Sequence, residues 1–478
     1  MKKKHLKVLF VASECTPIAK VGGLGDVIGS LPKALKKLGI DVQIVIPKYR
    51  QINLKKYPFK LIAKKLKVKK NFLNVYQGFL PESEVTLYLL ENEKYFGQNG
   101  IYFERSAFVG SFKEIQRFLF FSRAVLEVFQ SLKWKPDIIH CHDWHTAIIP
   151  LLLKAKSWKL KTKTLLTIHN LANQGKWKAR EILDFLNLRG DEVNSFKIRN
   201  RENNFNIFQQ GILNADLINT VSPTYSREIL TKEYGEGLEK SLLKRKKDLF
   251  GILNGIDHDR FNPKTDSDLK VNYSLSNLNK KRENKNELQK ILKLPQNQKT
   301  PLFSFIGRLT SQKGIDLISQ IIPDLVNFGC QLVILGVGEK KYEEELLKLA
   351  KKYPKNIAVQ IKFDPVLAQK IYAGSDFFLM PSRFEPCGLG QQISQRYGTL
   401  PIARKTGGLA DTIKDEKTGF LFKEYKANAF LKVIKKALKF YKNKKEWQKM
   451  QKRTMKKDFS WKKSAKKYLK LYRKLSLT

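Results

Sequence analysis

Short apolar runs rich in β-branched residues alternate with amphipathic stretches along the whole chain. Four such runs occur in the first half and four more follow after residue 300, at 7–12, 41–46, 137–140, 164–168, 302–306, 331–335, 356–360 and 377–380. Strands separated by helices in this way form parallel sheets that helices cover on both faces. The sequence therefore predicts an α/β fold with two Rossmann-like, doubly wound domains.

The domain boundaries follow from the stretch between the two sets of runs. Residues 262–300 are polar, rich in Asn and Lys, and weakly periodic apart from a short helix around 287–292. We therefore expect an N-terminal domain over 1–260, an interdomain connection over 261–300 and a C-terminal domain over 301–457.

A separate helix is expected at the C-terminus, over 458–478. Ser460 is a good N-cap residue, and the apolar residues that follow fall on one helical face: Trp461, Ala465, Tyr468, Tyr472 and Leu475. Such a face must pack on another element.

Length and cysteine usage narrow the class of protein. A chain of 478 residues is expected to form about two or three domains, and none of its apolar runs is long enough to cross a bilayer. The N-terminal stretch resembles a signal peptide, but Lys7 and Glu14 interrupt it and no small-residue cleavage site follows. The chain has four cysteines, at positions Cys15, Cys141, Cys330 and Cys387, and none of them has CxxC spacing. This pattern argues against a zinc site and against a disulfide framework. It favours a location in the reducing cytoplasm.

The formal net charge of +47 would attract nucleic acid or another polyanion. The basic residues are mostly Lys, however, and they are spread along predicted helix faces, for example at 432–439 and 462–467. Dispersed lysines are typical of a solvated surface. We therefore expect no specific nucleic-acid partner and no membrane partner.

A glycine-rich turn follows the first predicted strand. In residues 19–26, Lys20 precedes Gly22 and Gly23, and Asp26 lies at the start of an apolar helix that Gly39 ends. Backbone amides at a helix N-terminus, together with a mobile cation, suit phosphate oxygens. The alternative is a tight turn capped by Asp26.

Charged residues and glycines also follow strands in the second half. Arg308 and Lys313 come after the strand at 302–306, Glu385 lies in the segment 381–390, and a glycine turn occupies 405–411. Ligands of open α/β sheets bind at the carboxyl ends of the strands, where two cations would neutralise a diphosphate without a metal. A structural salt bridge is the alternative.

The segment 140–145 holds three histidines and an aspartate. Strand geometry would place His140 and His142 on one face, but no further Cys or His of matching spacing completes a metal site. A sugar-contacting loop with Asp143 and Trp144 is the preferred interpretation. His169 also ends a predicted strand, where a lone histidine is more often structural than catalytic.

Together these motifs closely resemble those of bacterial glycogen synthases and plant starch synthases, from one end of the chain to the other. The matching segments are 19–30, 142–145, 167–171, 220–229, 251–257, 307–314, 372–389, 398–402, 406–412 and 458–461. The resemblance implies a GT-B fold with a sugar nucleotide in the cleft and a C-terminal helix that crosses back to the first domain. It also implies a retaining, metal-independent hexosyltransferase that moves glucose from ADP-glucose to the 4-hydroxyl of an α-1,4-glucan.

The resemblance also suggests roles for single residues. It implies four catalytic residues, namely His169, Arg308, Lys313 and Glu385. The implied donor contacts are Lys20, Gly22, Gly23, Asn254, Tyr372, Cys387, Gly388, Leu389, Thr406, Gly407 and Gly408. The implied acceptor contacts are Asp143, Trp144 and Asn170.

The chain departs from the family pattern at a few positions. Asn173 replaces an aromatic residue, Gln209 a common lysine and Gly390 a threonine, and the segment 392–395 is more polar than usual. None of these changes the charged residues expected at the donor. They bear on donor and acceptor preference.

Two rival functions remain open at this point. One is another GT-B transferase that uses UDP-glucose or a short acceptor, and the other is a basic protein that binds nucleic acid or glucan without catalysis. Retention of all the expected charged residues argues against the second. We expect no cofactor and no metal, and the sequence does not indicate an oligomeric state.

Overall fold

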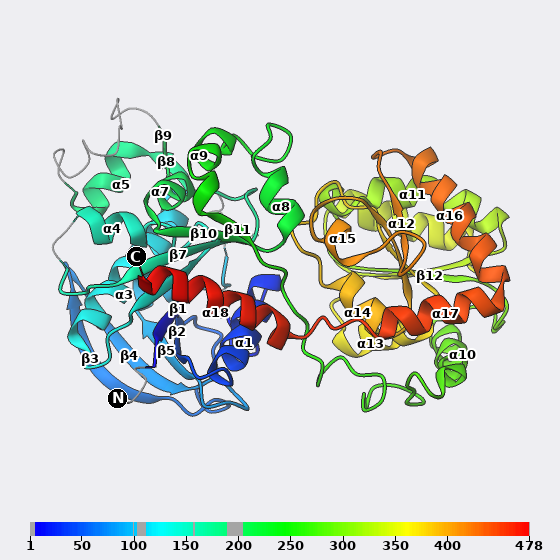
Figure 1. The fold of residues 1–478 in the computed structure, drawn as a ribbon, viewed down its shortest axis with the longest axis horizontal. Helices are drawn as coiled ribbons and strands as arrows, with labels where there is room; N and C mark the ends of the chain where they lie inside the picture. Colours follow the sequence, from blue (N-terminus) through cyan, green and yellow to red (C-terminus); the bar gives the residue numbers. More distant parts are fainter. Residues whose placement is uncertain (1–4, 99, 103–110, 156–157, 189–203, 478) are drawn as a thin grey trace. The chain divides into compact units, whose positions relative to one another are not determined.

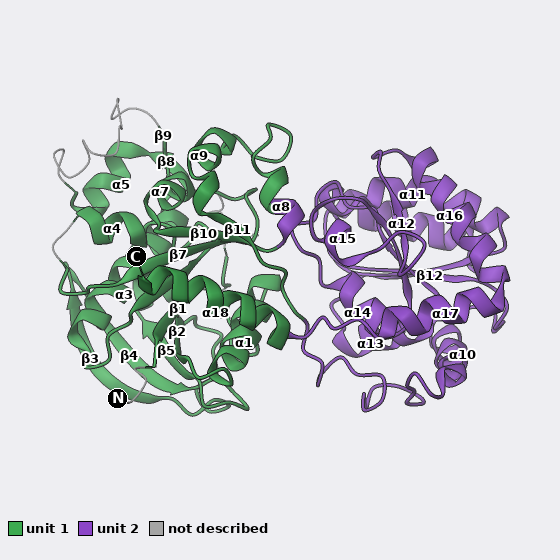
Figure 2. Cartoon of the chain, viewed as in Figure 1, with its two compact units in different colours: residues 1–221, 226–255, 461–478 green, residues 222–225, 256–460 purple. Residues whose placement is uncertain are grey.

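The computed structural model describes residues 5–98, 100–102, 111–155, 158–188 and 204–477. The chain divides into two compact units (Figure 2). Unit 1 comprises residues 1–221, 226–255 and 461–478, and unit 2 comprises residues 222–225 and 256–460. Each unit is an open α/β structure, and this confirms the predicted fold class.

Unit 1 is built on a nine-stranded sheet in its described part, with the order β11-β10-β7-β6-β1-β2-β5-β4-β3 (Figure 1). All neighbours are parallel except at the β3–β4 and β4–β5 pairs. The strands are β1 (Lys7–Val11), β2 (Asp41–Pro47), β3 (Lys60–Val68), β4 (Asn71–Phe79), β5 (Thr86–Glu91), β6 (Ile138–His142), β7 (Lys163–Ile168), β10 (Leu217–Thr220) and β11 (Leu249–Gly251).

Helices and a second, small sheet complete the described part of unit 1. A small antiparallel pair is formed by β8 (Lys176–Lys178) and β9 (Asn204–Asn206). The helices are α1 (Gly23–Lys36), α2 (Glu93–Phe96), α3 (Phe112–Ser131), α4 (Ile149–Ala155), α5 (Ala179–Leu186), α7 (Ile207–Asn214), α8 (Pro223–Glu228), α9 (Glu239–Lys244), α18 (Trp461–Leu477) and the 3₁₀ turn Lys246–Asp248. Helix α8 belongs to unit 1 only in part, because residues 222–225 lie in unit 2.

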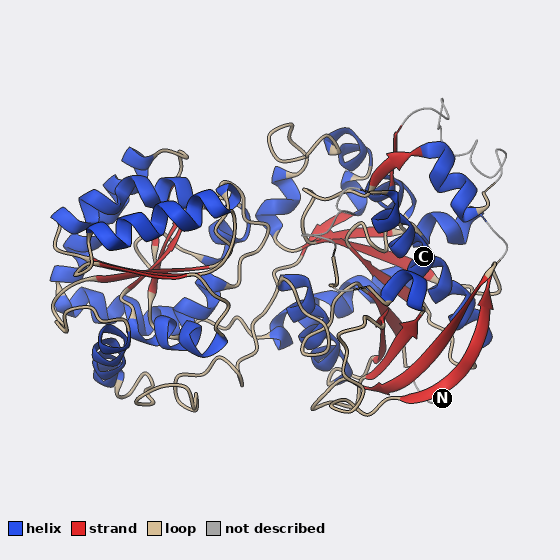
Figure 3. Ribbon diagram, turned by 180° about the vertical axis from the view of Figure 1, so that it is seen from behind, coloured by secondary structure: helices blue, strands red, loops and turns tan. Residues whose placement is uncertain are grey.

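Unit 2 contains a six-stranded, fully parallel sheet with the order β14-β13-β12-β15-β16-β17. The strands are β12 (Leu302–Ile306), β13 (Gln331–Leu335), β14 (Ile357–Gln360), β15 (Phe377–Met380), β16 (Leu400–Arg404) and β17 (Phe420–Phe422). Helices cover both faces of this sheet (Figure 3), which fits the mostly apolar residues of its strands.

The helices of unit 2 follow its strands in the alternation that the sequence predicts. They are α10 (Lys281–Ile291), α11 (Ile315–Asn327), α12 (Lys340–Lys352), α13 (Pro365–Gly374), α14 (Gly390–Arg396), α15 (Gly407–Thr412), α16 (Ala427–Lys442) and α17 (Lys444–Met455), with 3₁₀ turns at Leu278–Lys280 and Ser311–Lys313. No helix among the residues described is long and apolar enough to cross a membrane.

The C-terminal helix α18 lies in unit 1, where it packs against α1. All five residues of its predicted apolar face are buried in the core of that unit. The Tyr472 hydroxyl group and Nδ1 of His140 also share a hydrogen bond, at 2.8 Å. The last helix therefore belongs to the same unit as the N-terminal strands, as the fold class predicts.

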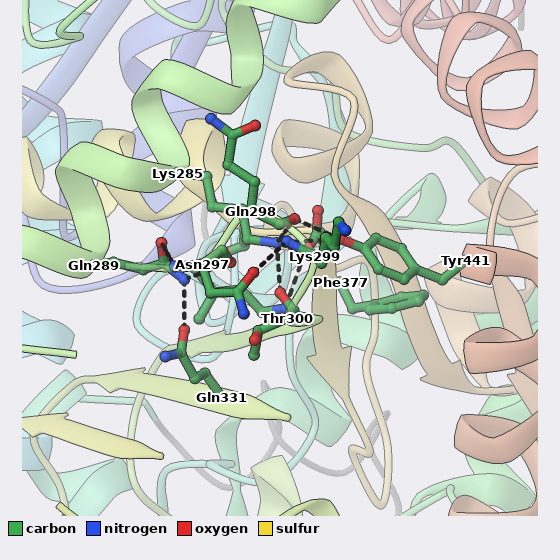
Figure 4. Close-up of polar contacts among 12 residues, drawn as sticks. Lys285, Gln289, Asn297, Gln298, Lys299, Thr300, Gln331, Phe377 and Tyr441 are labelled. Atoms are coloured by element: carbon green, nitrogen blue, oxygen red, sulfur yellow. Dashed lines mark hydrogen bonds and ion pairs between the residues drawn. The ribbon is translucent and has the colours of Figure 1, made fainter. Parts of the chain in front are cut away.

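The segment 261–300, expected to connect the domains, lies within unit 2 instead. Its helix α10 begins at Lys281, earlier than predicted, and buries Leu288 in a core cluster with β12 and β13. Lys285 donates to the carbonyl oxygens of Gln298 and Thr300 (Figure 4). Its ammonium also lies 2.6 Å from the carboxylate of Asp376. The sequence did not predict this packing because the segment is polar and weakly periodic. Two of its lysines, Lys281 and Lys285, are buried and hydrogen-bonded instead of exposed.

In each unit the order in which successive strands are added to the sheet reverses beside the first strand. β1 lies between β2 and β6, and β12 lies between β13 and β15. The loops that leave the carboxyl ends of β1, β6 and β7 therefore share one edge of unit 1, and those after β12, β15 and β16 share one edge of unit 2. Such switch points are where open α/β sheets bind ligands.

Candidate active site

The residues expected at the site fall into two groups, one in each unit. We call Lys20, Asp143, His169 and Asn170 the unit-1 half-site, since they follow β1, β6 and β7. We call Arg308, Lys313, Glu385 and the turn 406–408 the unit-2 half-site, since they follow β12, β15 and β16. Each group lies at the switch point of its own sheet.

The glycine turn of the unit-1 half-site is organised around Glu14. The amides of Val21 and Gly22 donate to Oε2 of this buried carboxylate at 2.7 and 2.8 Å, and the Tyr102 hydroxyl donates to Oε1 at 2.7 Å. The amide of Gly22 thus has an internal acceptor, and its expected phosphate contact stays a prediction. The sequence signal for Glu14 was a single carboxylate inside an otherwise apolar stretch.

Lys20 and Gly23 leave this turn open to a ligand. The ammonium of Lys20 lies 2.6 Å from Asp26, and both side chains are partly exposed. A Cβ atom on Gly23 would meet no other atom within 4 Å. Asp26 therefore pairs with the lysine in the first turn of α1, and the N-cap residue of this helix is Gly22.

Asp143 supports the backbone of the next loop. Its carboxylate accepts hydrogen bonds from the amides of His169 at 2.7 Å and Asn170 at 3.3 Å. The residue adopts φ = 55°, and burial raises the pKa of its carboxyl group to about 7. This aspartate positions the two residues that follow β7, and its expected contact with the acceptor stays a prediction.

The imidazole of His169 contacts a second histidine. Its Nε2 atom lies 3.0 Å from Nδ1 of His142, the last residue of β6. Burial lowers the pKa of His169 to about 3, so the ring is neutral at neutral pH. A neutral imidazole can donate one hydrogen bond and accept another.

Trp144 lies in the core of unit 1, with 6% of its surface exposed. Its ring packs against Phe118 and His145, and a Cβ atom on Gly175 would lie 2.3 Å from it. Little of the ring remains for stacking on a sugar, so its acceptor contact stays a prediction. Asn170 instead accepts a hydrogen bond from the amide of Ala172 at its side-chain oxygen.

Asn254 follows β11 in the same unit and is almost fully buried. Its side-chain oxygen makes no hydrogen bond with any residue that the structure describes. An unsatisfied buried acceptor of this kind is uncommon in proteins. It is compatible with the expected donor contact.

In the unit-2 half-site, Lys313 and Glu385 form an ion pair. The ammonium lies 2.5 Å from Oε2 of the carboxylate, which also accepts from the Ser382 hydroxyl at 3.1 Å. The side chain of Glu385 is 6% exposed and that of Lys313 is 20% exposed. The salt bridge considered as an alternative therefore exists, between two of the expected catalytic residues.

Arg308 has a different environment. Its guanidinium is exposed and donates one hydrogen bond to the side chain of Gln312, at 3.3 Å. No carboxylate of the described residues lies within ion-pair distance of it. This arginine is therefore free to meet an anionic ligand.

The glycines of the turn 406–408 allow two backbone segments to touch. A Cβ atom on Gly407 would lie 2.0 Å from the carbonyl oxygen of Glu385, and one on Gly408 would lie 2.0 Å from that of Cys387. The amide of Gly408 donates to the Glu385 carbonyl at 3.0 Å. Gly388 is required for a further reason, since it adopts φ = 69°.

The remaining expected donor contacts surround this turn. Tyr372 in α13 is buried, its ring lies 5.2 Å from that of Phe378, and burial raises the pKa of its hydroxyl group. Cys387 is buried, Leu389 is partly buried, and Thr406 is the buried N-cap residue of α15. Cys387, Leu389 and Thr406 thus lie in the segments that follow β15 and β16, whereas Tyr372 lies in the helix that precedes β15.

The positions that depart from the family pattern have structural roles or are exposed. Gln392 is buried and donates to the carbonyl oxygen of Gly388, and Gln209 donates to the Ser241 hydroxyl. A Cβ atom on Gly390 would lie 2.9 Å from the Phe378 ring. Asn173 is exposed.

The histidines of 140–145 are held by hydrogen bonds and ring contacts. His140 contacts Tyr472 and the Thr167 hydroxyl, and His142 contacts His169. In the part of the chain that the structure describes, no group of three or more His, Cys, Asp or Glu residues is arranged to hold a metal ion.

Two Rossmann-like units, each with charged residues and glycine turns at its switch point, define a glycosyltransferase of the GT-B type. The starch synthase catalytic domain family matches residues 7–244, and the family described as glycosyl transferases group 1 matches residues 285–456. The chain belongs to the family of bacterial glycogen synthases and plant starch synthases. This membership confirms the resemblance and the expected class of enzyme, a glucosyltransferase.

Relatives that match over almost their whole length support this assignment. The chain is 45% identical to a glycogen synthase of Thermosipho melanesiensis, over 98% of this chain and 99% of that one. It is 44% identical to a glycogen synthase of Lactobacillus acidophilus, over 98% and 100% of the two chains.

Comparison with solved structures supports the same fold. The catalytic domain of starch synthase IV from Arabidopsis thaliana, bound to ADP and acarbose, has a TM-score of 0.89 at 33% identity and covers 99% of this chain. A sucrose-phosphate synthase from Thermosynechococcus elongatus covers 98% of this chain with a TM-score of 0.62 at 17% identity, which shows a shared fold alone.

Proposed function

We propose that this chain transfers glucose from ADP-glucose to the 4-hydroxyl group at the non-reducing end of an α-1,4-glucan, with retention of configuration. The observation that carries the proposal is the likeness over 99% of the chain to a starch synthase solved with ADP and acarbose. Both half-sites retain the charged residues that such a transfer needs.

The unit-2 half-site would stabilise the leaving group. Negative charge develops on the diphosphate as the glycosidic bond breaks, and fixed cations stabilise it without reorganisation. One N–H of Lys313 is used by Glu385, which leaves two for phosphate oxygens. Arg308 adds a guanidinium whose planar geometry suits two oxygens at once.

Glu385 would hold the donor sugar. Its Oε2 atom is engaged by Lys313 and Ser382, and no hydrogen bond to Oε1 is made by the residues described. A buried carboxylate with a free oxygen is a strong acceptor for sugar hydroxyls. The ion pair thus links the residue that meets the leaving group with the residue that meets the sugar.

The residues of the unit-1 half-site would also have roles in the transfer. The neutral ring of His169 can donate to a sugar hydroxyl, and Asp143 holds its backbone in place. Lys20 and the amide of Gly23 would contact the donor phosphates at the N-terminus of α1. The acceptor 4-hydroxyl would attack from the face that the diphosphate leaves, and a departing phosphate oxygen would take its proton.

The transfer would need neither a metal ion nor a cofactor, because Arg308 and Lys313 bring the positive charge. We expect glucosyl transfer to survive exhaustive treatment with EDTA. Loss of activity that Mg²⁺ or Mn²⁺ restores would contradict the metal-free mechanism.

The cytoplasm would be the compartment of this enzyme. All four cysteines are buried and free of disulfide bonds, as suits a reducing environment.

One assay tests the proposal as a whole. Radiolabelled ADP-glucose and UDP-glucose are supplied separately with glycogen as primer, and the label in polymer is measured before and after digestion by an α-1,4-specific amylase. We expect faster incorporation from ADP-glucose, and label that the amylase releases. Transfer to a short sugar only, or a preference for UDP-glucose, would favour the rival transferase.

A further inference from the structure

His142 contacts the ring of His169 but belongs to a different strand. The two histidines are 27 residues apart, and their ring nitrogens, Nδ1 of His142 and Nε2 of His169, are separated by 3.0 Å. Because β6 and β7 are parallel neighbours, the strand ends bring these side chains together. One of the two nitrogens must donate the hydrogen bond and the other must accept it.

The ring of His142 is fully buried and closely packed. The Phe10 ring stacks on it at a centroid distance of 5.3 Å, and the His140 ring lies 4.1 Å away. Burial and the two neighbouring histidines lower its pKa well below the usual value, so the ring is neutral. Its second nitrogen, Nε2, is buried and makes no hydrogen bond with any described residue.

This unpartnered nitrogen distinguishes the two possible arrangements. If His169 donates, the proton of neutral His142 is on Nε2, and a buried N–H is left without an acceptor. If His142 donates from Nδ1, its Nε2 is an unprotonated acceptor without a donor. Orphaned N–H groups in protein interiors are rarer than acceptors that lack a donor. The geometry therefore favours donation from His142 to His169.

Donation by His142 determines where His169 carries its own proton. With Nε2 accepting, the neutral ring of His169 has its proton on Nδ1. This Nδ1 atom makes no hydrogen bond with any residue described, and its ring is only partly buried. His169 would then present a hydrogen-bond donor to a ligand.

We propose that His142 is a positioning residue, which holds His169 in the tautomer that carries its proton on Nδ1 and so presents a donor to a hydroxyl oxygen of the sugar. This inference rests on the proposed function, in which His169 contacts the donor sugar. Asp143 fixes the backbone of His169 and His142 fixes its ring, so two consecutive residues at the carboxyl end of β6 hold the same catalytic group. A fixed tautomer matters because the wrong one would turn an acceptor toward the hydroxyl oxygen.

The tautomer can be measured without any assay of activity. The chain contains six histidines, and ¹⁵N shifts of labelled histidine rings distinguish protonated from unprotonated nitrogens. The His169 signals are identified by their loss in His169→Gln. We expect an unprotonated Nε2 and a protonated Nδ1 in the unmodified enzyme at pH 7. A protonated Nε2 on His169 would overturn the inference.

Variants of His142 then test whether the contact matters for transfer. His142→Ala removes the donor, so kcat should fall at least about tenfold while ADP affinity is unchanged, and His169 should populate both tautomers. His142→Asn keeps an N–H donor at the position of Nδ1 and should restore turnover to within about threefold of the unmodified enzyme.

His140→Ala is the matched control, since His140 lies on the same face of β6 and is equally buried but contacts Tyr472 and Thr167. It should leave the His169 tautomer unchanged. Unchanged turnover and an unchanged tautomer in His142→Ala would overturn the inference. If the tautomer is as expected but His169→Ala transfers glucose normally, the role of His142 stands and the proposed sugar contact of His169 is wrong.

Discussion

The ion pair between Lys313 and Glu385 links two residues that the motifs suggested would act on different parts of the substrate. Lys313 was expected at the diphosphate and Glu385 at the sugar, and they lie 72 residues apart in the chain. Their contact of 2.5 Å means that removal of either charge leaves its partner unpaired. For Glu385, which is almost fully buried, that loss is costly.

Lys313→Ala should lower kcat by about a hundredfold or more, the scale seen for lost electrostatic stabilisers, and should weaken ADP binding. Glu385→Gln keeps the size of the side chain, so transfer should collapse while ADP, which has no glucose, binds nearly normally. Turnover and ADP affinity are measured for each variant. Strong turnover in Glu385→Gln, or a loss of ADP binding as large as in Lys313→Ala, would show that Glu385 does not serve the sugar.

The double variant extends this test. Because the two groups are in direct contact, the loss of transition-state stabilisation in Lys313→Ala/Glu385→Gln should be clearly smaller than the sum of the two single losses. Additive losses would mean that the ion pair has no part in the reaction.

Asp143 should make stability depend on pH in an unusual direction. Its pKa is about 7 in the folded chain and near 3.8 when unfolded, so between these values the folded state binds more protons. The free energy of unfolding should therefore fall as pH rises from about 4 to 7, by up to about 1.4 kcal/mol per unit, and level off above 7. The free energy of unfolding is measured with urea for the unmodified chain and for Asp143→Asn across this range, and the value for the variant is subtracted from that for the unmodified chain. This difference should fall as pH rises. A difference that rises with pH would contradict the prediction.

At the scale of elements, α18 completes the core of the unit that β1 begins. Its apolar face packs against α1. Two of its tyrosine hydroxyl groups contact buried polar residues of the sheet: that of Tyr472 contacts His140, and that of Tyr468 accepts a hydrogen bond from Asn219 at 2.9 Å. A helix at the end of the chain thus supports strands near its beginning. Its contribution should be to stability more than to chemistry.

Tyr472→Phe tests this separation. The variant leaves Nδ1 of the buried His140 without its partner, so the free energy of unfolding should fall by about 1 to 3 kcal/mol. The value of kcat should not change, because His140 does not contact His169. Thermal unfolding and turnover are compared with Lys470→Ala, an exposed position on the same helix. A large loss of turnover with unchanged stability would give α18 a direct part in catalysis.

At the scale of the whole molecule, most of the lysines lie outside the candidate active site. The formal charge of +47 arises from residues spread over exposed helix surfaces, whereas Lys281 and Lys285 are buried and bonded to oxygen atoms of unit 2. A dispersed field attracts polyanions without reading their sequence.

Binding to mixed RNA should therefore weaken steeply between low and physiological salt and show no preferred sequence. Filter binding at several salt concentrations, with glucosyl transfer measured in parallel, checks both points. A sequence-specific complex at physiological salt would revive the nucleic-acid alternative.

The sequence by itself determined the fold class, the apolar face of α18 and the strand ends that carry the charged residues. These are local properties, since periodicity reports which face of an element is buried and motifs report which residues follow a strand. Only the tertiary structure decided the partners: Glu14 with the amides of Val21 and Gly22, His142 with His169, and Lys313 with Glu385. It also placed α10 in unit 2. The lysines of this helix made the sequence resemble a polar linker, but in the structure two of them are buried and bonded to oxygen atoms. The physical reason is that the contacts of His142 and Lys313 join residues from different strands and loops, and a local pattern carries no information about which strand ends become neighbours. The contact of Glu14 lies within the loop between β1 and α1, where the tertiary fold of the loop decides which amides meet the carboxylate.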